Sequence, residues 1–240
     1  GWSTFASQAT VAWCRRHAVP YVLLVESNER DARPGWRRTV KNAVVPTVVG
    51  RAAEVLVVGS LARESMRARG VPDDQISVVA NTVDVARLAE AADALAPRRD
   101  TLRAEVGIDA DDVVVLSVAR LAPEKGLDTL VRAAAAAGEP RLVVALAGSG
   151  PERERLASLA TELGVRLVLL PDIPWERIVE RYAVADVFAL LSRHEPWGVV
   201  VNEAAACGLP LVLSERVGAA ADLLREGENG FRVPVGDVAA

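Results

Sequence analysis

The chain has 240 residues, of which 51% are hydrophobic and 25% charged, the composition of an ordinary globular protein. A net charge of −4, without a basic stripe interleaved with aromatic residues, argues against nucleic acid as a partner. Two cysteines are too few for a disulfide framework or a metal cluster, and no apolar run reaches the roughly 18 residues of a membrane span.

Apolar runs alternate with helix-like segments along the whole chain, the pattern of a parallel sheet covered by helices on both faces. Strands are predicted at residues 21–25, 55–58, 76–79, 113–118, 142–147, 166–170, 187–191, 211–213 and 231–233. Helices are predicted at residues 5–16, 36–45, 61–69, 85–94, 101–106, 127–137, 152–163, 175–182 and 199–207. The expected fold class is therefore α/β.

An alanine-rich segment, residues 86–100, separates the first three predicted strands from the others. We predict a domain boundary there, with residues 1–97 in a first domain and its linker, and residues 98–240 in a second. A domain of this kind needs on the order of 150–200 residues. We therefore expect the first domain to be only partly present and the second to lack its closing helices.

Two glutamates, Glu195 and Glu203, lie eight positions apart, one after an apolar strand and one in the first turns of the next helix. Gly198 lies at the mouth of that helix, where the N–H groups near Val199 and Val200 and the helix dipole attract an anion. Carboxylates on both sides of a bound phosphate suit a nucleotide-sugar, with its ribose, diphosphate and hexose. The alternative is that both acids are solvated surface charges.

A second motif fills the loop 119–126, after the strand 113–118. It contains Lys125, one of only two lysines (the other is Lys41) among 28 basic residues. Arg120 can bind two phosphate oxygens with its planar fork while Lys125 supplies a compact charge. An exposed basic loop without a ligand is the alternative.

The turn at Gly148 and Gly150 is a weak candidate for a dinucleotide fingerprint. Its third glycine position is Arg153, and the residue about twenty positions on, where that fingerprint has an acid, is Val168. We expect the turn to pass near the diphosphate or sugar of a donor, or to be purely structural. Ile173 follows the next strand and either contacts the nucleobase or packs in the core.

Together these motifs resemble the retaining family 4 glycosyltransferases, in which two Rossmann-like domains form the GT-B arrangement. The family's Glu-x7-Glu element matches Glu195 and Glu203, and its Gly-Arg-Leu…Lys-Gly loop matches 120–126, with Ala119 in place of glycine. Its Gly-x-Gly-Pro turn matches 148–151. The resemblance is strong over 112–237 and loose before residue 80.

The resemblance implies that residues 1–97 hold the C-terminal part of an acceptor-side Rossmann-like domain and that 98–240 form the nucleotide-sugar-binding domain. It implies transfer from a nucleoside-diphosphate sugar with retention of configuration, without another cofactor or an obligate metal. Glu195, Arg120 and Lys125 are then the expected catalytic residues. The expected donor-binding residues are Glu203, Gly198, Val199, Val200, Gly148, Gly150 and Ile173. We expect residues 1–240 alone to be inactive.

The acceptor is open: a glycan, a lipid or a small molecule. Glu26 stands where the family often has a histidine on the acceptor side. The basic segment 36–41 carries an aromatic anchor and either touches an anionic membrane surface or forms a solvated face. We expect a cytoplasmic protein, with peripheral membrane contact as an alternative. Other functions left open are a nucleotide-sugar epimerase and a non-catalytic nucleotide-sugar-binding module.

Overall fold

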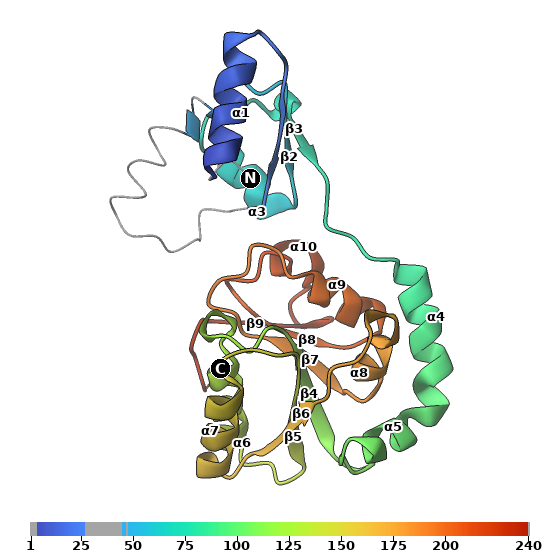
Figure 1. The fold of residues 1–240 in the computed structure, drawn as a ribbon. Helices are drawn as coiled ribbons and strands as arrows, with labels where there is room; N and C mark the ends of the chain where they lie inside the picture. Colours follow the sequence, from blue (N-terminus) through green and yellow to red (C-terminus); the bar gives the residue numbers. More distant parts are fainter. Residues whose placement is uncertain (1–3, 27–44, 47, 240) are drawn as a thin grey trace. The chain divides into compact units, whose positions relative to one another are not determined.

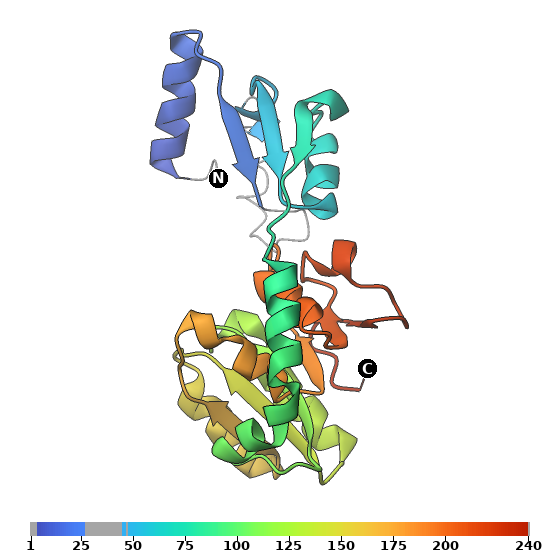
Figure 2. The same cartoon turned by 90° about the vertical axis from the view of Figure 1, so that its right-hand side faces the viewer.

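The computed structural model describes residues 4–26, 45–46 and 48–239. Two units make up the chain, Gly1–Asn81 and Thr82–Ala240. The division falls earlier than the boundary predicted after residue 97. The cause is the helix α4 (Val85–Leu95), which packs on α8 and α9 of the second unit and buries Leu88. Figure 2 shows α4 lying across this unit.

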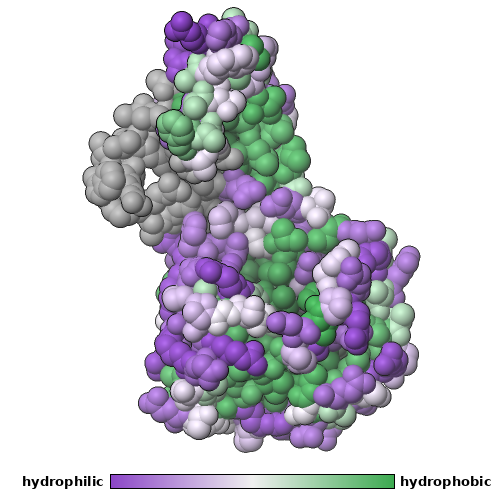
Figure 3. Space-filling model, in the orientation of Figure 1, coloured by the Kyte–Doolittle hydropathy of each residue, from purple (hydrophilic) through white to green (hydrophobic). Residues whose placement is uncertain are grey.

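The first unit contains a three-stranded parallel sheet in the order β1-β2-β3, made of β1 (Val22–Val25), β2 (Glu54–Val57) and β3 (Ile76–Val78). Its helices include α1 (Phe5–Arg16), α3 (Ser60–Arg67) and the 3₁₀ helix η1 (Asp73–Gln75). Thr4 caps α1 by accepting a hydrogen bond from the N–H of Ser7. The strands alternate, burying Leu23 and Val25 and exposing Val22 and Leu24. Figure 3 shows hydrophobic surface over these strands.

The second unit contains a six-stranded parallel sheet in the order β6-β5-β4-β7-β8-β9. Its strands are β4 (Val113–Val118), β5 (Leu142–Ala147), β6 (Arg166–Leu170), β7 (Val187–Leu190), β8 (Leu211–Ser214) and β9 (Gly230–Val233). The helices after α4 are α5 (Arg99–Glu105), α6 (Leu127–Ala137), α7 (Arg153–Leu163), α8 (Val179–Ala183), α9 (Val199–Ala206) and α10 (Ala220–Leu223). The short 3₁₀ helices are η2 (Ala96–Arg98), η3 (Pro123–Lys125) and η4 (Trp175–Arg177).

The strand order reverses between β4 and β7. From β4 the chain builds outward through β5 to β6, returns to place β7 on the other side of β4, and continues to β8 and β9. Accordingly α6 packs with α7, while α4 packs with α8 and α9 (Figure 1). In an open parallel sheet, the crevice outside the carboxyl ends of the strands at such a reversal is the usual place for a ligand.

The central strands of this sheet are buried on both faces, and therefore they read as continuous apolar runs. At the amino ends of β4 and β7, an ionic cluster joins α5 to Asp186, the residue before β7. Arg103, 2% exposed, donates to the carboxylate of Asp186 at 2.7 Å and to the carbonyl of Val184 at 3.0 Å. Burial alone would raise the pKa of Asp186, but hydrogen bonds from the Val114 N–H and the Arg99 and Arg103 guanidinium groups lower it.

Every predicted strand is present, with ends shifted by one residue at most. The prediction of one continuous helix at 175–182 is wrong, because the chain forms η4 and then the separate short helix α8. The helix α10 has only four residues, too few to show helical periodicity in the sequence. The segment 36–41 and most of the predicted helix 36–45 lie outside the described residues. In the part of the chain that is described, no helix is both long and apolar enough to span a bilayer.

Candidate functional site

The carboxyl ends of β4 and β7 bring two of the predicted motifs together. These strands are parallel neighbours, with Leu116 opposite Phe188. The loop 119–126 leaves β4, and the segment 191–198 leaves β7, so both begin at the same edge of the sheet. This edge is where the strand order reverses, and it is therefore the expected ligand-binding edge.

Gly126 sets how closely the two segments approach. It has a φ of +63°, and a Cβ built there would lie 2.1 Å from the carbonyl oxygen of Leu191. A side chain at this position would push the loop 119–126 away from the end of β7. The same glycine ends η3 and caps α6, which leaves Lys125 beside the segment that follows β7.

Lys125 and Glu195 form an ion pair across these two segments. The Lys125 ammonium donates to Oε2 of Glu195, and the side chains are only 19% and 15% exposed. The main chain of Glu195 is held in turn by the segment after β8: its N–H donates to the Arg216 carbonyl at 3.3 Å, and its carbonyl accepts from the Gly218 N–H at 2.9 Å. Two residues predicted separately as catalytic are thus in direct contact.

Arg193 is a residue that the sequence reasoning missed. Its guanidinium donates to both carboxylate oxygens of Asp128, at 2.8 and 2.9 Å, and to the carbonyl of Pro123. Its own N–H donates to the carbonyl of Glu124 at 2.8 Å. Arg193 therefore ties the segment after β7 to both the loop 119–126 and the first turn of α6. Its sequence signal was its place next to His194-Glu195, shortly after a strand.

The amino end of α9 opens at the same edge. Gly198, the N-cap, has a φ of +95° and no side-chain cap. A Cβ there would lie 3.2 Å from Cγ of Glu195 and from Cδ2 of Leu190. The N–H groups of Val199 and Val200 have no intrahelical acceptor, because they belong to the first turn. They are thus available to an anion close to the Lys125–Glu195 pair.

Glu203 lies one turn further along α9 and accepts a hydrogen bond from the hydroxyl of Tyr182. Tyr182 is almost fully buried, and burial, reinforced by the negative charge of Glu203, raises its pKa well above its usual value. Burial and the same charge raise the pKa of Cys207 to about 11. Both neighbours of Glu203 therefore remain protonated near neutral pH.

The glycine turn after β5 packs on the loop that carries Arg120. Cβ atoms at Gly148 and Gly150 would lie 2.1 Å from the Ala119 carbonyl oxygen and 2.3 Å from that of Leu121. The N–H of Leu121 donates to the carbonyl of Ser149 at 2.8 Å. The turn therefore has a structural role in shaping the loop 119–126. Arg120 itself is exposed and pairs with Glu124.

Ile173 lies further from these residues. It is half-buried after β6, and β5 separates that strand from β4. Its predicted contact with a nucleobase stays a prediction. Glu26 follows β1 in the first unit, and its side chain is exposed.

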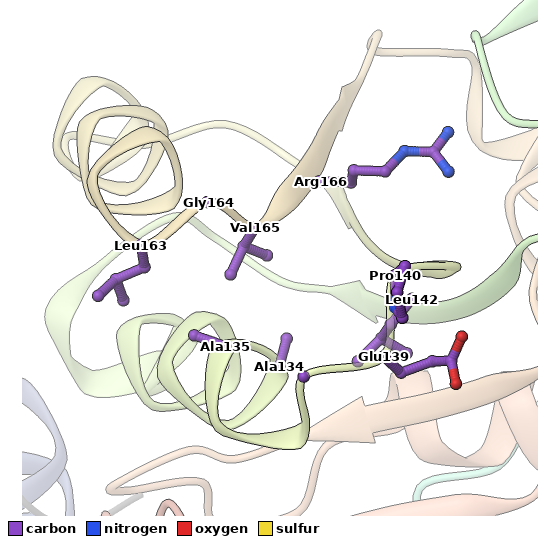
Figure 4. Close-up of a pocket in the computed structure, with 10 residues that line it drawn as sticks. Ala134, Ala135, Glu139, Pro140, Leu142, Leu163, Gly164, Val165 and Arg166 are labelled. Atoms are coloured by element: carbon purple, nitrogen blue, oxygen red, sulfur yellow. The ribbon is translucent and has the colours of Figure 1, made fainter.

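A pocket of about 250 Å³ lies elsewhere, at the amino ends of β5 and β6 (Figure 4). Its walls are the last turns of α6 and α7 and the turns after these helices, including Ala134, Ala135, Leu163 and Val165. Among the lining residues, Arg166 supplies the positive charge, but it is paired with Asp112. This pocket lies at the edge of the sheet opposite the usual ligand crevice.

Comparison with known proteins points to one family. The family described as glycosyl transferases group 1 matches residues 98–240. A D-inositol 3-phosphate glycosyltransferase of Acidothermus cellulolyticus is 37% identical over 220 residues, which cover 85% of this chain and 47% of that protein. A GDP-mannose-dependent phosphatidylinositol monomannoside mannosyltransferase of Mycolicibacterium smegmatis is 33% identical over 220 residues, covering 87% of this chain and 54% of that protein. The chain thus spans about half the length of these relatives.

Solved structures agree on the fold. The structure of HepE from Anabaena in complex with UDP matches with a TM-score of 0.79 at 24% identity, over 95% of this chain and 62% of that one. Sucrose-phosphate synthase from Thermosynechococcus elongatus matches with a TM-score of 0.73 at 25% identity, over 97% of this chain and 59% of that one. The predicted fold class, α/β with Rossmann-like units of GT-B type, is confirmed. Because the family match covers more than half of the chain and the fold agrees with it, this chain belongs to the glycosyl transferases group 1.

Proposed function

We propose that this protein is a retaining glycosyltransferase whose second unit binds a nucleoside-diphosphate sugar at the carboxyl ends of β4 and β7. The observation that carries the proposal is the Lys125–Glu195 pair beside the open amino end of α9. A cation and free N–H groups there suit a diphosphate, and carboxylates on either side suit hydroxyl groups. The family and the curated relatives favour transfer over an epimerase or a non-catalytic module.

In the proposed reaction, the bond between the anomeric carbon of the sugar and the diphosphate oxygen breaks. The acceptor oxygen bonds to that carbon on the same face, and its proton passes to the departing diphosphate. Negative charge therefore builds on the diphosphate. Lys125, Arg120 and the N–H groups of Val199 and Val200 are assigned to stabilise it, because donors fixed in advance need no reorganisation during the reaction.

Glu195 is assigned to the sugar. Its carboxylate keeps one oxygen on Lys125 and presents the other to sugar hydroxyls or to the positive charge that develops on the ring. Glu203 is assigned to the ribose, whose two hydroxyls can both donate to one carboxylate. We propose that the site needs no metal, since the chain's own cations and N–H groups bind the diphosphate; chelation by EDTA should then leave the affinity for the nucleotide unchanged.

The acceptor is proposed from the names of the relatives, which specify D-inositol 3-phosphate in one case and phosphatidylinositol monomannoside in the other. Both contain an inositol ring, so inositol phosphates are the first acceptors to test. A lipid acceptor would fit the predicted peripheral membrane contact of the segment 36–41 in a cytoplasmic protein.

The proposal is tested by calorimetric titration with UDP, GDP, ADP and their sugars, comparing wild type with Arg120→Ala/Lys125→Ala. At least one nucleotide should bind wild type, and the double variant should lose about 100-fold or more in affinity, since two charge-assisted contacts are removed. The matched control is Arg141→Ala/Arg225→Ala, which removes two exposed positive charges outside the site. Equal affinity in wild type and the first double variant would refute the assignment.

A further inference from the structure

Tyr182 is not among the residues that the motifs single out, yet it contacts the proposed ribose-binding carboxylate directly. Its side chain is 1% exposed, and its hydroxyl donates to Oε2 of Glu203. The ring lies 6.2 Å from that of Phe188, centroid to centroid, so it is fixed between α8 and the sheet. A ring held in this way fixes the position of its hydroxyl, and therefore one oxygen of the carboxylate.

The direction of this hydrogen bond is determined. Glu203 can only accept as a carboxylate, and a phenol has a single proton to donate. Burial and the charge of Glu203 both raise the pKa of Tyr182, so the hydroxyl keeps its proton at working pH. One lone pair of Glu203 Oε2 thus accepts the hydrogen bond from Tyr182, while Oε1 and the other lone pair of Oε2 can accept from a ligand.

The position of Glu203 on α9 gives this arrangement a consequence for nucleotide binding. Residues four apart on a helix lie about 6 Å from each other on the same face. Helical side chains also lean toward the amino end, so the carboxylate of Glu203 leans toward the N–H groups near Val199. In a nucleotide the ribose is bonded directly to the diphosphate. With the diphosphate at the proposed site, the ribose would therefore lie beside the Glu203 carboxylate.

We propose that Tyr182 is a positioning residue that sets the preference of this site for ribonucleotides. Its hydroxyl holds the Glu203 carboxylate in the orientation that accepts both ribose hydroxyls. Without it, the carboxylate turns to other rotamers and the two oxygens no longer match the diol. This inference rests on the proposed function, namely on Glu203 contacting the ribose.

The test compares the affinities of UDP and 2′,3′-dideoxy-UDP, or the corresponding pair for the base that the titrations rank first. Tyr182→Phe removes one oxygen and keeps the buried ring. It should lower the affinity for the ribonucleotide about tenfold, near the lower limit for a hydrogen bond to a charged group. The affinity for the dideoxy analogue should stay unchanged. Glu203→Gln should abolish the preference for ribose, and the double variant should lose nothing further.

The chain supplies a matched control. Tyr21, its other tyrosine, donates to the carbonyl of Val48 at 2.6 Å in the first unit, so Tyr21→Phe removes a comparable hydroxyl elsewhere and should leave both affinities unchanged. If Tyr182→Phe weakens both nucleotides equally, or neither, its positioning role is refuted. If Glu203→Gln keeps the preference for ribose, the proposed role of Glu203 fails first. If no nucleotide binds wild type, the proposed function itself fails.

Discussion

Lys125 differs from the other basic residues near the site in the partner that it has. Arg120 pairs with Glu124 on its own loop, and Arg193 binds Asp128 at the start of α6. Lys125 alone among these three pairs with Glu195, in a setting where both side chains are mostly buried. A compact ammonium can serve Glu195 and a phosphate at once, because its three donors point in different directions.

Lys125→Arg tests whether this geometry matters beyond the charge. A guanidinium is planar and favours a two-pronged contact with a carboxylate, so it should engage both oxygens of Glu195 and turn away from the phosphate. We expect nucleotide affinity to fall about tenfold, with an unchanged unfolding temperature. Calorimetry and thermal unfolding measure the two quantities, with Arg141→Lys at the opposite edge of the sheet as control. Wild-type affinity in Lys125→Arg would show that only the charge matters.

At the scale of elements, the site depends on the contact between the loop 119–126 after β4 and the segment 191–198 after β7. Gly126 allows the close approach, and Arg193 fastens it through Asp128, Pro123 and Glu124. Because β4 and β7 lie side by side in the sheet, the two strands already bring these segments to one edge. The arginine then fixes the loop 119–126 relative to Glu195.

Arg193→Ala should therefore weaken nucleotide binding although Arg193 has no assigned contact with the ligand. We expect a loss of about tenfold, because the loop must be ordered at the moment of binding. The free energy of unfolding should change by less than about 1 kcal/mol, since the ion pair is partly exposed. Asp128→Asn should have a similar effect, and the double variant should show no added loss. Additive losses would indicate that the two residues act independently.

The residue contacts that position the site could not be predicted, although most of the fold could. The strands 113–118, 142–147 and 166–170 were predicted with the ends they have, because each is a mostly apolar run of strand length. Because the sequence pattern predicts a parallel sheet, the residues that follow neighbouring strands begin at the same edge of that sheet. The Lys125–Glu195 and Arg193–Asp128 pairs join residues 70 and 65 positions apart, and no local pattern signals such a pairing.

At the scale of the whole molecule, the boundary between the two units lies before α4, between Asn81 and Thr82. The described contacts place α4 with the second unit, and all the proposed site residues belong to that unit as well. The family match begins later, at residue 98, near the boundary predicted from the alanine-rich segment. The two boundaries, before residue 82 and before residue 98, differ in whether the second unit includes α4, the helix that buries Leu88.

Expressing residues 82–240 and residues 98–240 as separate pieces tests whether the second unit needs α4. The longer piece should unfold cooperatively and bind the nucleotide as the whole chain does. The shorter piece should be less stable by at least about 2 kcal/mol, the lower limit for loss of one buried leucine side chain. Denaturant unfolding and calorimetry provide the comparison. Equal stability of the two pieces would place the boundary after residue 97.

The empty site already contains a counter-ion for its own lysine. Because the charges of Lys125 and Glu195 cancel, an isolated inorganic phosphate gains little net attraction and meets the repulsion of the nearby carboxylate. A sugar nucleotide places its diphosphate on the remaining donors of Lys125 and its sugar hydroxyls on the second oxygen of Glu195, with the ion pair kept. The ion pair thus makes the site selective against small inorganic anions, since only a ligand that offers both groups satisfies both partners.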